Sequence, residues 1–402
     1  MSIEAPRLPP PQLALRLRRA LGGRAGWGGV ALQIVFVLIL IWAGYETFVN
    51  ASVNLENQRI ASGFGFLWNN AGFDVSQSLI PYSGADSYFR VFIVGLLNTI
   101  LVSVIGIFFA TLLGFMVALG RLSPNWLMSR VAGGYVELIR NLPLLFQMLF
   151  WYLAVLGALP GPRQSVSLFG TFFLNNRGLI VPRPIQEHGA EPFLTAVLLA
   201  IVASIVLRQY ARRQLFRNGI AIRIWPYVAA LLIGLPLSSA LVFGLPFTFE
   251  LPKLRGFNFA GGVRVVPELV ALTLALSTYT AAFIAEIIRA GILAVDRGQM
   301  DAGLSLGLGR GAVLRLIVVP QAMRVILPPL TSQYLNLTKN SSLAVAIGYP
   351  DLVSVFAGTA LSQTGQAIEI IAITMGVYLA LSLFTSAIMN FYNWRLGRSL
   401  RT

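Results

Sequence analysis

The chain has 402 residues, of which 56% are hydrophobic and 11% are charged, whereas about a quarter of the residues of a soluble domain are charged. Such a chain lacks the polar surface to face water on all sides, so we predict an all-α membrane protein. The net charge of +15 does not indicate nucleic-acid binding, because the basic residues lie between apolar blocks. The chain has no cysteine, which excludes disulfides, thiolate catalysis and cysteine-based metal sites.

Eight apolar segments approach the roughly 20 residues that a membrane-spanning helix needs. They are residues 30–49, 91–119, 131–159, 193–207, 224–244, 267–288, 321–347 and 367–392. The first has too long an apolar run for a signal peptide, and no small-residue cleavage pattern follows Phe48, so we interpret it as an uncleaved anchor. The fourth is short, between Pro192 and Arg208, so it either tilts little or extends into a flank. The second and third are long enough to tilt or to project from the bilayer.

The distribution of basic residues predicts the orientation. If the N-terminus is cytoplasmic, the inner regions carry nineteen cations and the outer regions carry eight, which favours cytoplasmic termini at both ends. The bias is incomplete because two outer loops carry three cations each, namely Arg163, Arg177 and Arg183 in one and Lys253, Arg255 and Arg264 in the other. Their Pro and Gly content predicts irregular loops. The run Pro9-Pro10-Pro11 predicts an extended or disordered lead-in.

One inner loop, between Glu286 and Pro320, is unusually apolar. Its large apolar residues are Leu304, Leu306, Leu308, Val313, Leu314 and Leu316. Exposed apolar residues on a loop usually mark a contact surface. Glycines divide the loop into short helical pieces, at Gly303, Gly307, Gly309 and Gly311. We predict a short amphipathic helix–turn element that lies parallel to the membrane and docks into a groove of a partner.

The same loop resembles the EAA loop of ABC-importer permeases, whose pattern is Glu-Ala-Ala, three residues, Gly, nine residues, then Ile-x-Leu-Pro. The matching positions are occupied by Asp301, Ala302, Gly303, Gly307, Ile317, Val319 and Pro320. Three of them differ from the pattern, with Asp for Glu, Gly for the second Ala and Val for Leu. The resemblance implies that the segment Met300–Gly311 is a coupling helix, with Asp301 as the polar anchor to an ATPase and Gly307 as the tight turn.

Four other stretches resemble the polar amino acid uptake branch of these permeases, the histidine/glutamine type. They are Leu96–Ser123, Glu137–Tyr152, Glu286–Ile292 and Asn336–Gly348. The resemblance covers roughly residues 88–160 and 265–395. It implies a type I permease core of five helices, to which an N-terminal anchor helix and a two-helix insertion are added. Long insertions of this kind resemble those of general L-amino acid permeases.

These features divide the chain into five regions. Residues 1–87 hold a cytoplasmic tail, the anchor helix and a periplasmic loop, and residues 88–160 hold the first part of the core. The insertion with its two extra helices occupies 161–265. The rest of the core, with the coupling loop 289–320, occupies 266–395, and 396–402 form a cytoplasmic tail.

The resemblance also implies the partners. These are a dimer of ATP-binding cassette ATPases, a second and similar permease, a periplasmic amino acid-binding protein, an amino acid substrate and the lipid of the bacterial inner membrane. The chain has no G-x-x-x-x-G-K-[ST] phosphate loop. We therefore expect ATP and magnesium to bind the ATPase, and we expect this chain to act as a transport subunit that is no enzyme and binds no cofactor or metal.

Several polar residues lie within apolar segments and are candidates for the translocation path. Arg140 lies three residues after Glu137, a spacing at which side chains pair on a helix, so structural pairing and a pathway role both stay open. Glu286 and Arg289 repeat this spacing, and there we favour a structural pair. Gln147 lies in the same segment as Arg140.

Among these residues, Lys339 has the highest free-energy cost of lying within the membrane. A charge inside an apolar block therefore normally faces a cavity or a partner. Its polar neighbours include Asn336, Asn340 and Ser341, and we expect Pro328-Pro329 to interrupt the same helix. This segment is a candidate for lining the path, with subunit packing or gating as the alternative.

Three other functions compete with this interpretation. An ion-coupled secondary transporter typically has repeated halves and intramembrane acids, and it would leave the EAA-like loop unexplained. A membrane enzyme would need a nucleophile–base or metal cluster, whereas the single histidine, His188, lies in an outer loop. The same machinery with another cargo, such as an opine, sulphate or a peptide, stays open.

Overall fold

The computed structural model describes residues 27–57, 63–219 and 223–399, and the predicted lead-in at Pro9-Pro10-Pro11 lies outside these ranges. The chain forms two compact units. One contains the N-terminal part up to Phe66 together with Leu361–Ile370, and the other contains Leu67–Ala360 and the chain from Ile371 onward. The helix α2 (Trp27–Asn57) belongs to the first unit and covers the first predicted segment, with its apolar stretch at Ala31–Thr47.

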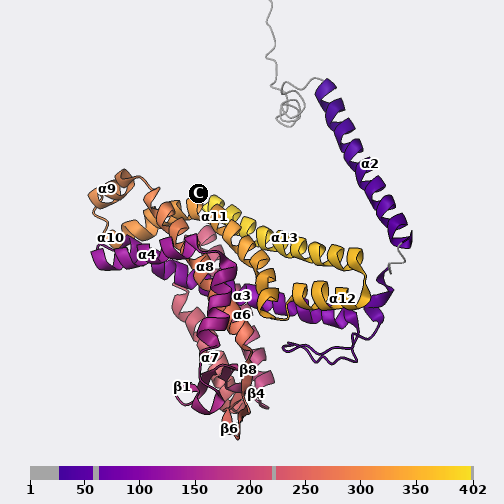
Figure 1. Ribbon diagram of the computed structural model, residues 1–402. Helices are drawn as coiled ribbons and strands as arrows, with labels where there is room; N and C mark the ends of the chain where they lie inside the picture. Colours follow the sequence, from indigo (N-terminus) through magenta and orange to yellow (C-terminus); the bar gives the residue numbers. More distant parts are fainter. Residues whose placement is uncertain (1–26, 58–62, 220–222, 400–402) are drawn as a thin grey trace, which may run out of the picture. The chain divides into compact units, whose positions relative to one another are not determined.

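Each of the eight predicted segments is helical (Figure 1). Among the described residues, six helical runs are long and apolar enough to cross a membrane, or seven if one bent pair counts as a single span. The six are α3 (Tyr88–Leu122), α6 (Ala190–Asn218), α7 (Trp225–Phe243), α8 (Pro267–Leu293), the run Arg310–Ile347, and Ala367–Arg395 within α13 (Ala367–Ser399). The long run contains α10 (Arg310–Val313), the π-helical turn η4 (Leu314–Val318), α11 (Val319–Asn340) and the 3₁₀ helix η5 (Ser341–Ile347).

Two of the predicted segments differ from the structure in shape. The third is a bent pair, in which α4 (Trp126–Asn141) meets α5 (Leu144–Leu149) and η2 (Phe150–Leu156) at 107°. Pro143 explains the bend, since a residue before proline is driven out of the helical conformation and Leu142 is extended, with φ −97° and ψ 132°. The fourth segment extends into both flanks, one of the two possibilities left open above, because α6 continues through Pro192 and Arg208 and is 29 residues long.

The core of the second unit forms where α3 packs against α8, with α11 alongside. Small residues recur on α3 at intervals of four, at Gly106, Ala110, Gly114 and Ala118. All four are buried, and a Cβ atom on Gly114 would lie 2.8 Å from Cβ of Ile284 on α8. Lipid gives helices no hydrophobic reason to associate, so close backbone approach between small residues is what holds them together.

A second group of buried residues joins α3 to the segment that follows α11. Nδ2 of Asn98 donates to the carbonyl oxygen of Pro350 at 2.9 Å, and the backbone N–H of Leu352 donates to Oγ1 of Thr99 at 3.0 Å. The carboxylate of Asp351 is fully buried and accepts from the Ser354 N–H at 2.8 Å. These contacts hold the π-helical segment η6 (Val353–Ala360) against α3.

The predicted outer loops are not irregular, and this expectation was wrong. Eight short strands form there, at β1 (Val166–Leu168), β2 (Phe172–Asn175), β3 (Gly178–Val181), β4 (Arg183–Gln186), β5 (Phe247–Glu250), β6 (Lys253–Arg255), β7 (Asn258–Ala260) and β8 (Val263–Val265). The antiparallel sheets have the orders β1-β2-β3-β8, β4-β5 and β6-β7. Because β3 pairs with β8 and β4 with β5, the two loops form one substructure, which we call the β cap (residues 161–189 and 244–266).

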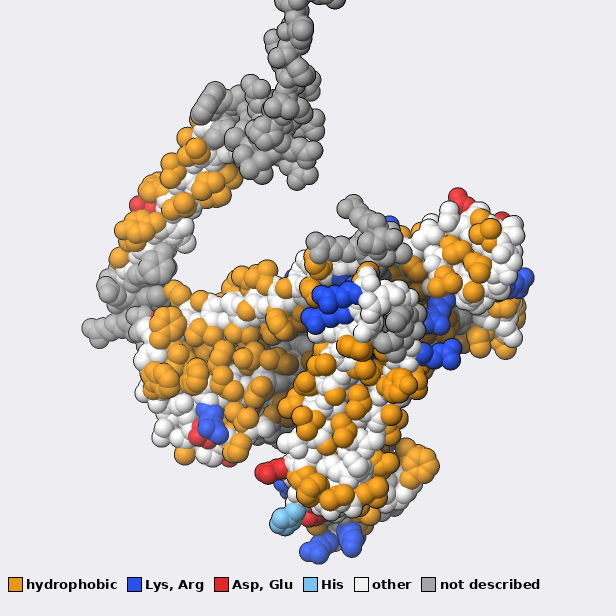
Figure 2. Space-filling view, turned by 180° about the vertical axis from the view of Figure 1, so that it is seen from behind, with side chains coloured by type: hydrophobic (Ala, Val, Ile, Leu, Met, Phe, Trp, Pro, Cys, Tyr) orange, Lys and Arg blue, Asp and Glu red, His pale blue; other side chains and the backbone are white. Residues whose placement is uncertain are grey.

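The β cap lies at one end of the helix pair α6 and α7, which pack against each other (Figure 1). The helices α9 (Arg297–Ser305) and α10 lie far from it, beyond the other end of the core helices. Figure 2 shows orange side chains along the helices, with Lys and Arg gathered near their ends. The distribution is that of a protein whose middle faces hydrocarbon.

The close contact at Gly114 leads to a stability prediction. In Gly114→Val the added side chain meets Ile284 and the carbonyl oxygen of Ala281, which a Cβ atom would approach to 3.0 Å. Overpacking of this kind typically costs about 1–3 kcal/mol, so we expect a lower unfolding temperature of the detergent-solubilised protein. The control is Gly134→Ala on α4, where a Cβ atom meets nothing within 4 Å. Equal unfolding temperatures for the two variants would contradict the packing described above.

Candidate functional site

The helix α9 follows α8 after a short linker and is capped at both ends. Asp296 is its N-cap residue, and Oδ1 of this aspartate accepts from the N–H of Gly298 at 2.6 Å. At the other end, the Gly307 N–H donates to the Leu304 carbonyl at 2.9 Å and the Leu308 N–H donates to the Gly303 carbonyl at 3.3 Å. These two bonds form a Schellman motif, which places the residue after the C-cap in the left-handed conformation.

Gly307 occupies this left-handed position, with φ +78°. Glycine adopts that conformation without the steric cost that a Cβ atom brings. The tight turn predicted at Gly307 is therefore present. It reverses the chain between α9 and α10.

The two arms of this reversal pack through Gly303, which is buried. A Cβ atom on Gly303 would lie 2.8 Å from Cδ1 of Ile317 and 3.0 Å from Cγ2 of Val313. The expectation that Val313 is exposed was wrong, because it is fully buried in this contact, and Leu308 is half-buried. Burial on the inner side of the turn is what gives the element a fixed shape.

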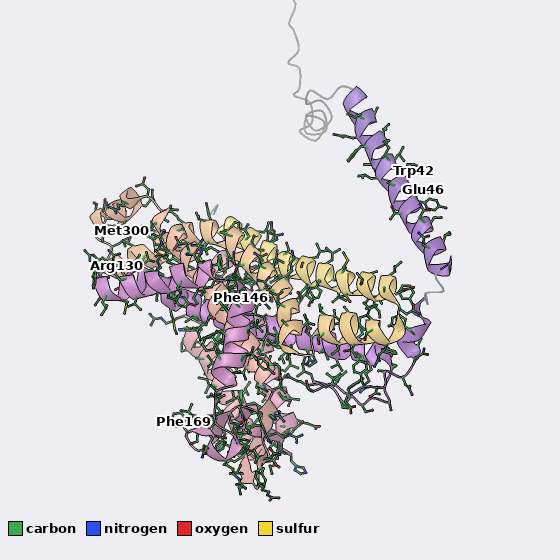
Figure 3. The ribbon with its side chains drawn as sticks, viewed as in Figure 1. Trp42, Glu46, Arg130, Phe146, Phe169 and Met300 are labelled. Carbon is green, nitrogen blue, oxygen red and sulfur yellow. The ribbon has the colours of Figure 1, made fainter. Side chains whose placement is uncertain are left out.

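The outer side of the turn presents apolar residues to solvent. They are Met300, Leu304, Leu306, Leu314 and Leu316, of which Leu306 is 81% exposed. Asp301 and Ala302 are exposed on α9 beside them. Figure 3 shows Met300 at the end of the protein that also carries Arg130, far from Phe169 in the β cap. We call this surface of α9, α10 and η4 the coupling face.

Pro320 shapes the transition from the coupling face into α11. A proline has no N–H, so it cannot donate to the carbonyl four residues earlier. The preceding turn, η4, is π-helical, and the N–H of Val319 donates to the carbonyl of Leu314, five residues earlier. Pro320 itself is half-buried at the start of α11.

An ionic cluster lies where α8 ends, next to the end of α3. The Glu286 carboxylate accepts from Nη2 of Arg289 at 2.6 Å and also from Arg121 of α3. The predicted pair of Glu286 with Arg289 is therefore confirmed, with Arg121 as a third member that the sequence spacing could not reveal. This cluster joins the ends of the two most closely packed helices immediately before the coupling face.

The other predicted pair is not formed. Arg140 is exposed and makes no ion pair with Glu137 in the described part of the chain; its guanidinium lies 5.2 Å from the centre of the Phe283 ring. A cation over an aromatic ring is attracted by the quadrupole of that ring. Arg140 thus contacts α8 instead of its own helix.

Gln147 braces the bend between α4 and α5. Its Nε2 donates to the carbonyl oxygens of Ile139 at 2.9 Å and Leu142 at 3.0 Å, at the end of α4 where the bend begins. The side chain is buried, and its Oε1 has no hydrogen-bond partner.

The polar residues of α11 share one face of the helix. Ser332, Asn336 and Lys339 follow one another at intervals of four and three, and all are exposed. Asn340 is half-buried and Ser341 is buried, with its hydroxyl donating to the Thr338 carbonyl at 2.7 Å. We had expected Pro328-Pro329 to interrupt the helix, and this expectation was wrong. The helix continues to Asn340, where it changes to the 3₁₀ helix η5.

The described residues contain no group of His, Asp and Glu side chains that could hold a metal ion. His188 is exposed at the base of the β cap, next to the start of α6. The sequence analysis missed the buried group around Asn98, Thr99 and Asp351. The signal for it was the pair Asn98-Thr99 within the apolar run of α3, since polar residues at such positions need partners.

The described part of the chain is an α-helical membrane protein with a protruding, glycine-turned apolar element at one end of its helices. Residues 110–398 match the family described as the binding-protein-dependent transport system inner membrane component. The chain belongs to this family, and it is a multi-pass membrane protein of an ABC importer.

Individual relatives match almost the whole chain. The permease protein YhdX of Escherichia coli (strain K12) is 55% identical over 365 residues, which cover 91% of this chain and 93% of that protein. The general L-amino acid transport system permease protein AapQ of Rhizobium johnstonii is 50% identical, with 91% of each chain covered. The glutamate/glutamine/aspartate/asparagine transport system permease protein BztB of Rhodobacter capsulatus is 40% identical, covering 90% of this chain and 92% of that protein.

Proposed function

We propose that this chain is the permease subunit through which an ABC importer moves polar or general L-amino acids across the bacterial inner membrane. The coupling face is the observation that carries this proposal. It is an exposed apolar surface on a capped helix–turn element, it follows directly from the core helices, and it bears the EAA-type residues Asp301, Ala302 and Gly303. An exposed apolar surface of this kind marks a site of contact with another protein or with the membrane.

The cargo is inferred from the relatives. AapQ and BztB are named for the transport of L-amino acids, and both match the chain over nine tenths of its length, insertion included. A cargo outside this class, such as an opine or a peptide, has no support from these full-length matches. We therefore favour L-amino acids, polar or general, as the transported class.

The partners follow from the separate functions of the subunits in such an importer. We propose that two ATPase subunits bind ATP and magnesium and contact the coupling face, since this chain has no phosphate-loop motif of its own. A second, similar permease completes the pathway, and a periplasmic amino acid-binding protein delivers the substrate. This chain contributes no catalytic residue and no cofactor.

The first test addresses the coupling face. In Asp301→Arg the charge of the proposed anchor is reversed, and in Gly307→Trp a bulky residue is forced into the left-handed conformation, at a cost of about 1–2 kcal/mol in addition to the bulk of the ring. Both variants are expected to lose the ATPase during affinity purification from solubilised membranes. Insertion of the permease into the membrane should be unchanged.

Conservative variants serve as controls for this test. Asp301→Glu keeps the charge and restores the residue of the EAA pattern, and Gly307→Asn keeps a residue that tolerates the left-handed conformation. Both should retain the ATPase. If Asp301→Arg and Gly307→Trp also capture the ATPase at the wild-type level, the assignment of the coupling face is wrong.

The orientation is proposed on the same basis. The coupling face and the β cap lie at opposite ends of the helices (Figure 3), so an ATPase at the former leaves the β cap on the periplasmic side. The arginine-rich end of α6, with Arg208, Arg212, Arg213 and Arg217, is then cytoplasmic, in agreement with the excess of cations in cytoplasmic loops. With an anchor helix before the core, both termini are cytoplasmic.

Single cysteines test the orientation directly, because the natural chain has none. Phe169→Cys in the β cap and Arg217→Cys near the end of α6 both replace exposed residues. In intact spheroplasts a membrane-impermeant maleimide should label Phe169→Cys and leave Arg217→Cys unlabelled. Inverted membrane vesicles should give the opposite pattern, and labelling of both positions from one side would refute the orientation.

We propose that the exposed polar face of α11 borders the translocation path. A charged residue on a membrane helix is costly when it faces lipid, and Lys339 makes no ion pair in the described part of the chain. The spacing of Ser332, Asn336 and Lys339 gives a continuous polar stripe, which a second permease subunit can enclose. Carboxylate and ammonium groups of an amino acid need polar partners of this kind.

This assignment is tested by measuring uptake of labelled amino acids into proteoliposomes that contain the complete transporter. Lys339→Met should lower uptake about tenfold, the factor that corresponds to loss of an interaction worth about 1.4 kcal/mol, while the ATPase still co-purifies. Arg208→Met, which removes an exposed cation from α6, is the matched control and should leave uptake unchanged. Wild-type uptake by Lys339→Met would exclude Lys339 from the path.

A further inference from the structure

The cations of the β cap are unusual for their position. Segments outside the cytoplasm normally carry few Lys and Arg residues, yet six lie in this cap, against two acids, Glu187 and Glu250. The six are Arg163, Arg177, Arg183, Lys253, Arg255 and Arg264, and all are exposed. They come from two loops separated by α6 and α7, and the pairing of β3 with β8 and of β4 with β5 brings them onto one substructure.

None of the six cations has an acidic partner within the β cap, all residues of which the structure describes. Three of them are instead fixed by neutral groups. Arg177 donates to the side chain of Asn258, and Nε of Arg264 donates to the carbonyl of Arg177 at 3.1 Å. Arg163 lies 4.0 Å from the centre of the Phe257 ring. These side chains are therefore held in place while their charges stay uncompensated.

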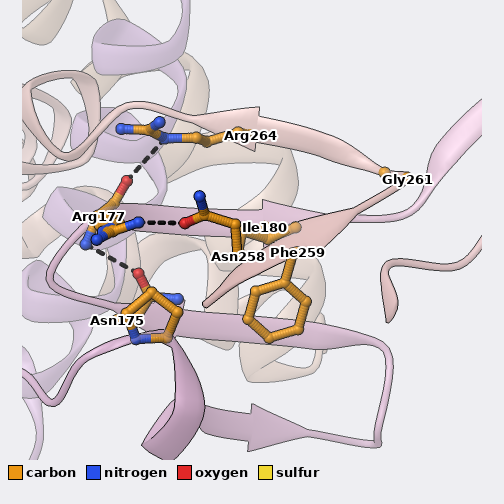
Figure 4. A pocket seen from close by; sticks show the side chains of 9 residues that line it. Asn175, Arg177, Ile180, Asn258, Phe259, Gly261 and Arg264 are labelled. Atoms are coloured by element: carbon orange, nitrogen blue, oxygen red, sulfur yellow. Dashed lines mark hydrogen bonds between the residues drawn. The ribbon is translucent and has the colours of Figure 1, made fainter. Parts of the chain in front are cut away.

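Two of these arginines line a cavity of about 340 Å³ (Figure 4). Arg177 and Arg264 contribute charge, Asn175 and Asn258 contribute amides, and the turn Gly261-Gly262 forms part of the wall. Glu250 is the nearest acid to that turn: a Cβ atom on Gly261 would lie 2.9 Å from Oε1 of Glu250. Two guanidinium groups beside one cavity match the planar, paired oxygens of a carboxylate.

An exposed aromatic residue stands at the tip of the hairpin between β1 and β2. Phe169 is 87% exposed and has φ +53°, in the left-handed region that a bulky residue rarely occupies. Phe257 is also exposed in the β cap. Aromatic and arginine side chains are the types that contribute most to binding at protein interfaces. A protruding phenylalanine in the same substructure as these unpaired arginines, at the other end of β2 from Arg177, therefore points to a protein contact.

We propose that the β cap is the docking surface for the solute-binding protein, and that the contacting face of that protein is acidic. A carboxylate side chain of the binding protein enters the cavity between Arg177 and Arg264, and Phe169, at the other end of β2, packs against an apolar patch of the same protein. Opposite charges on two proteins accelerate their encounter and fix their orientation. The proposal rests on the function proposed above, because it takes the cap to be periplasmic.

The test uses the complete transporter in nanodiscs and its purified amino acid-binding protein. The ATPase rate is measured while the concentration of substrate-loaded binding protein is increased. In the double variant Arg177→Glu with Arg264→Glu, like charges then face each other, so the concentration for half-maximal stimulation should rise about tenfold. The maximal rate should be kept, and added salt should weaken docking less than it does in the wild type.

Three comparisons make the result specific. Arg177→Lys with Arg264→Lys keeps the charge but removes the paired N–H groups, so it should raise the half-maximal concentration less than the double Glu variant does. Arg213→Glu, at the far end of α6, should leave the half-maximal concentration unchanged. Basic substitutions of acidic residues on the binding protein should restore docking to the double variant. Phe169→Ser should weaken docking without altering its dependence on salt.

Two results would overturn the proposal. An unchanged half-maximal concentration in the double variant would mean that the cap does not contact the binding protein. A change that occurs only in nanodiscs with anionic lipid would mean that the cations bind the membrane surface. The proposed function fails separately, and docking with it, if the binding protein does not stimulate the wild-type transporter at all.

Discussion

The close packing of α3 against α8 is the contact on which the other elements of the second unit depend. In hydrocarbon, van der Waals contact must supply the attraction that water supplies in a soluble core, and this requires backbones to approach closely. Gly114 meets Ile284 of α8, and Gly106 meets Leu337 of α11, so one stripe of small residues positions two neighbouring helices. At the ends of α3 and α8 the Glu286 carboxylate pairs with arginines, which fixes their register along the helix axis.

The coupling face is connected to these helices by two routes. The first is covalent, because α9 follows α8 after the linker 294–296. The second is through side chains, because Gly303 of α9 packs on Val313 and Ile317, which lead through η4 into α11. A partner that pushes on α9 therefore acts on α8 and α11 together. One of these two helices, α11, also carries the polar face.

The sequence was most informative where the membrane imposes strict demands. Spanning helices must be apolar over about 20 residues and must satisfy their own hydrogen bonds, so all eight helical segments could be located. Gly307 could be assigned to a tight turn because few other residues adopt its conformation.

The bend at Pro143 and the uninterrupted α11 at Pro328-Pro329 could not be told apart beforehand. Both contain proline, and only the surrounding contacts decide whether a helix bends. The contacts of Arg121 and Asp351 could not be predicted either, because their partners are distant in sequence. The strands were missed because each has only three or four residues between Pro and Gly signals.

The α6–α7 pair and the β cap leave and rejoin the neighbouring helices at a single spot. Pro160 accepts from the Asn176 N–H at 3.1 Å, Leu179 pairs with Val265, and α8 begins at Pro267. A segment whose two ends meet can be added, lost or exchanged without changing the distance between the core helices that flank it. The α6–α7 pair and the β cap therefore form a unit whose two ends lie together, so the length of this unit does not constrain the distance between η2 and α8.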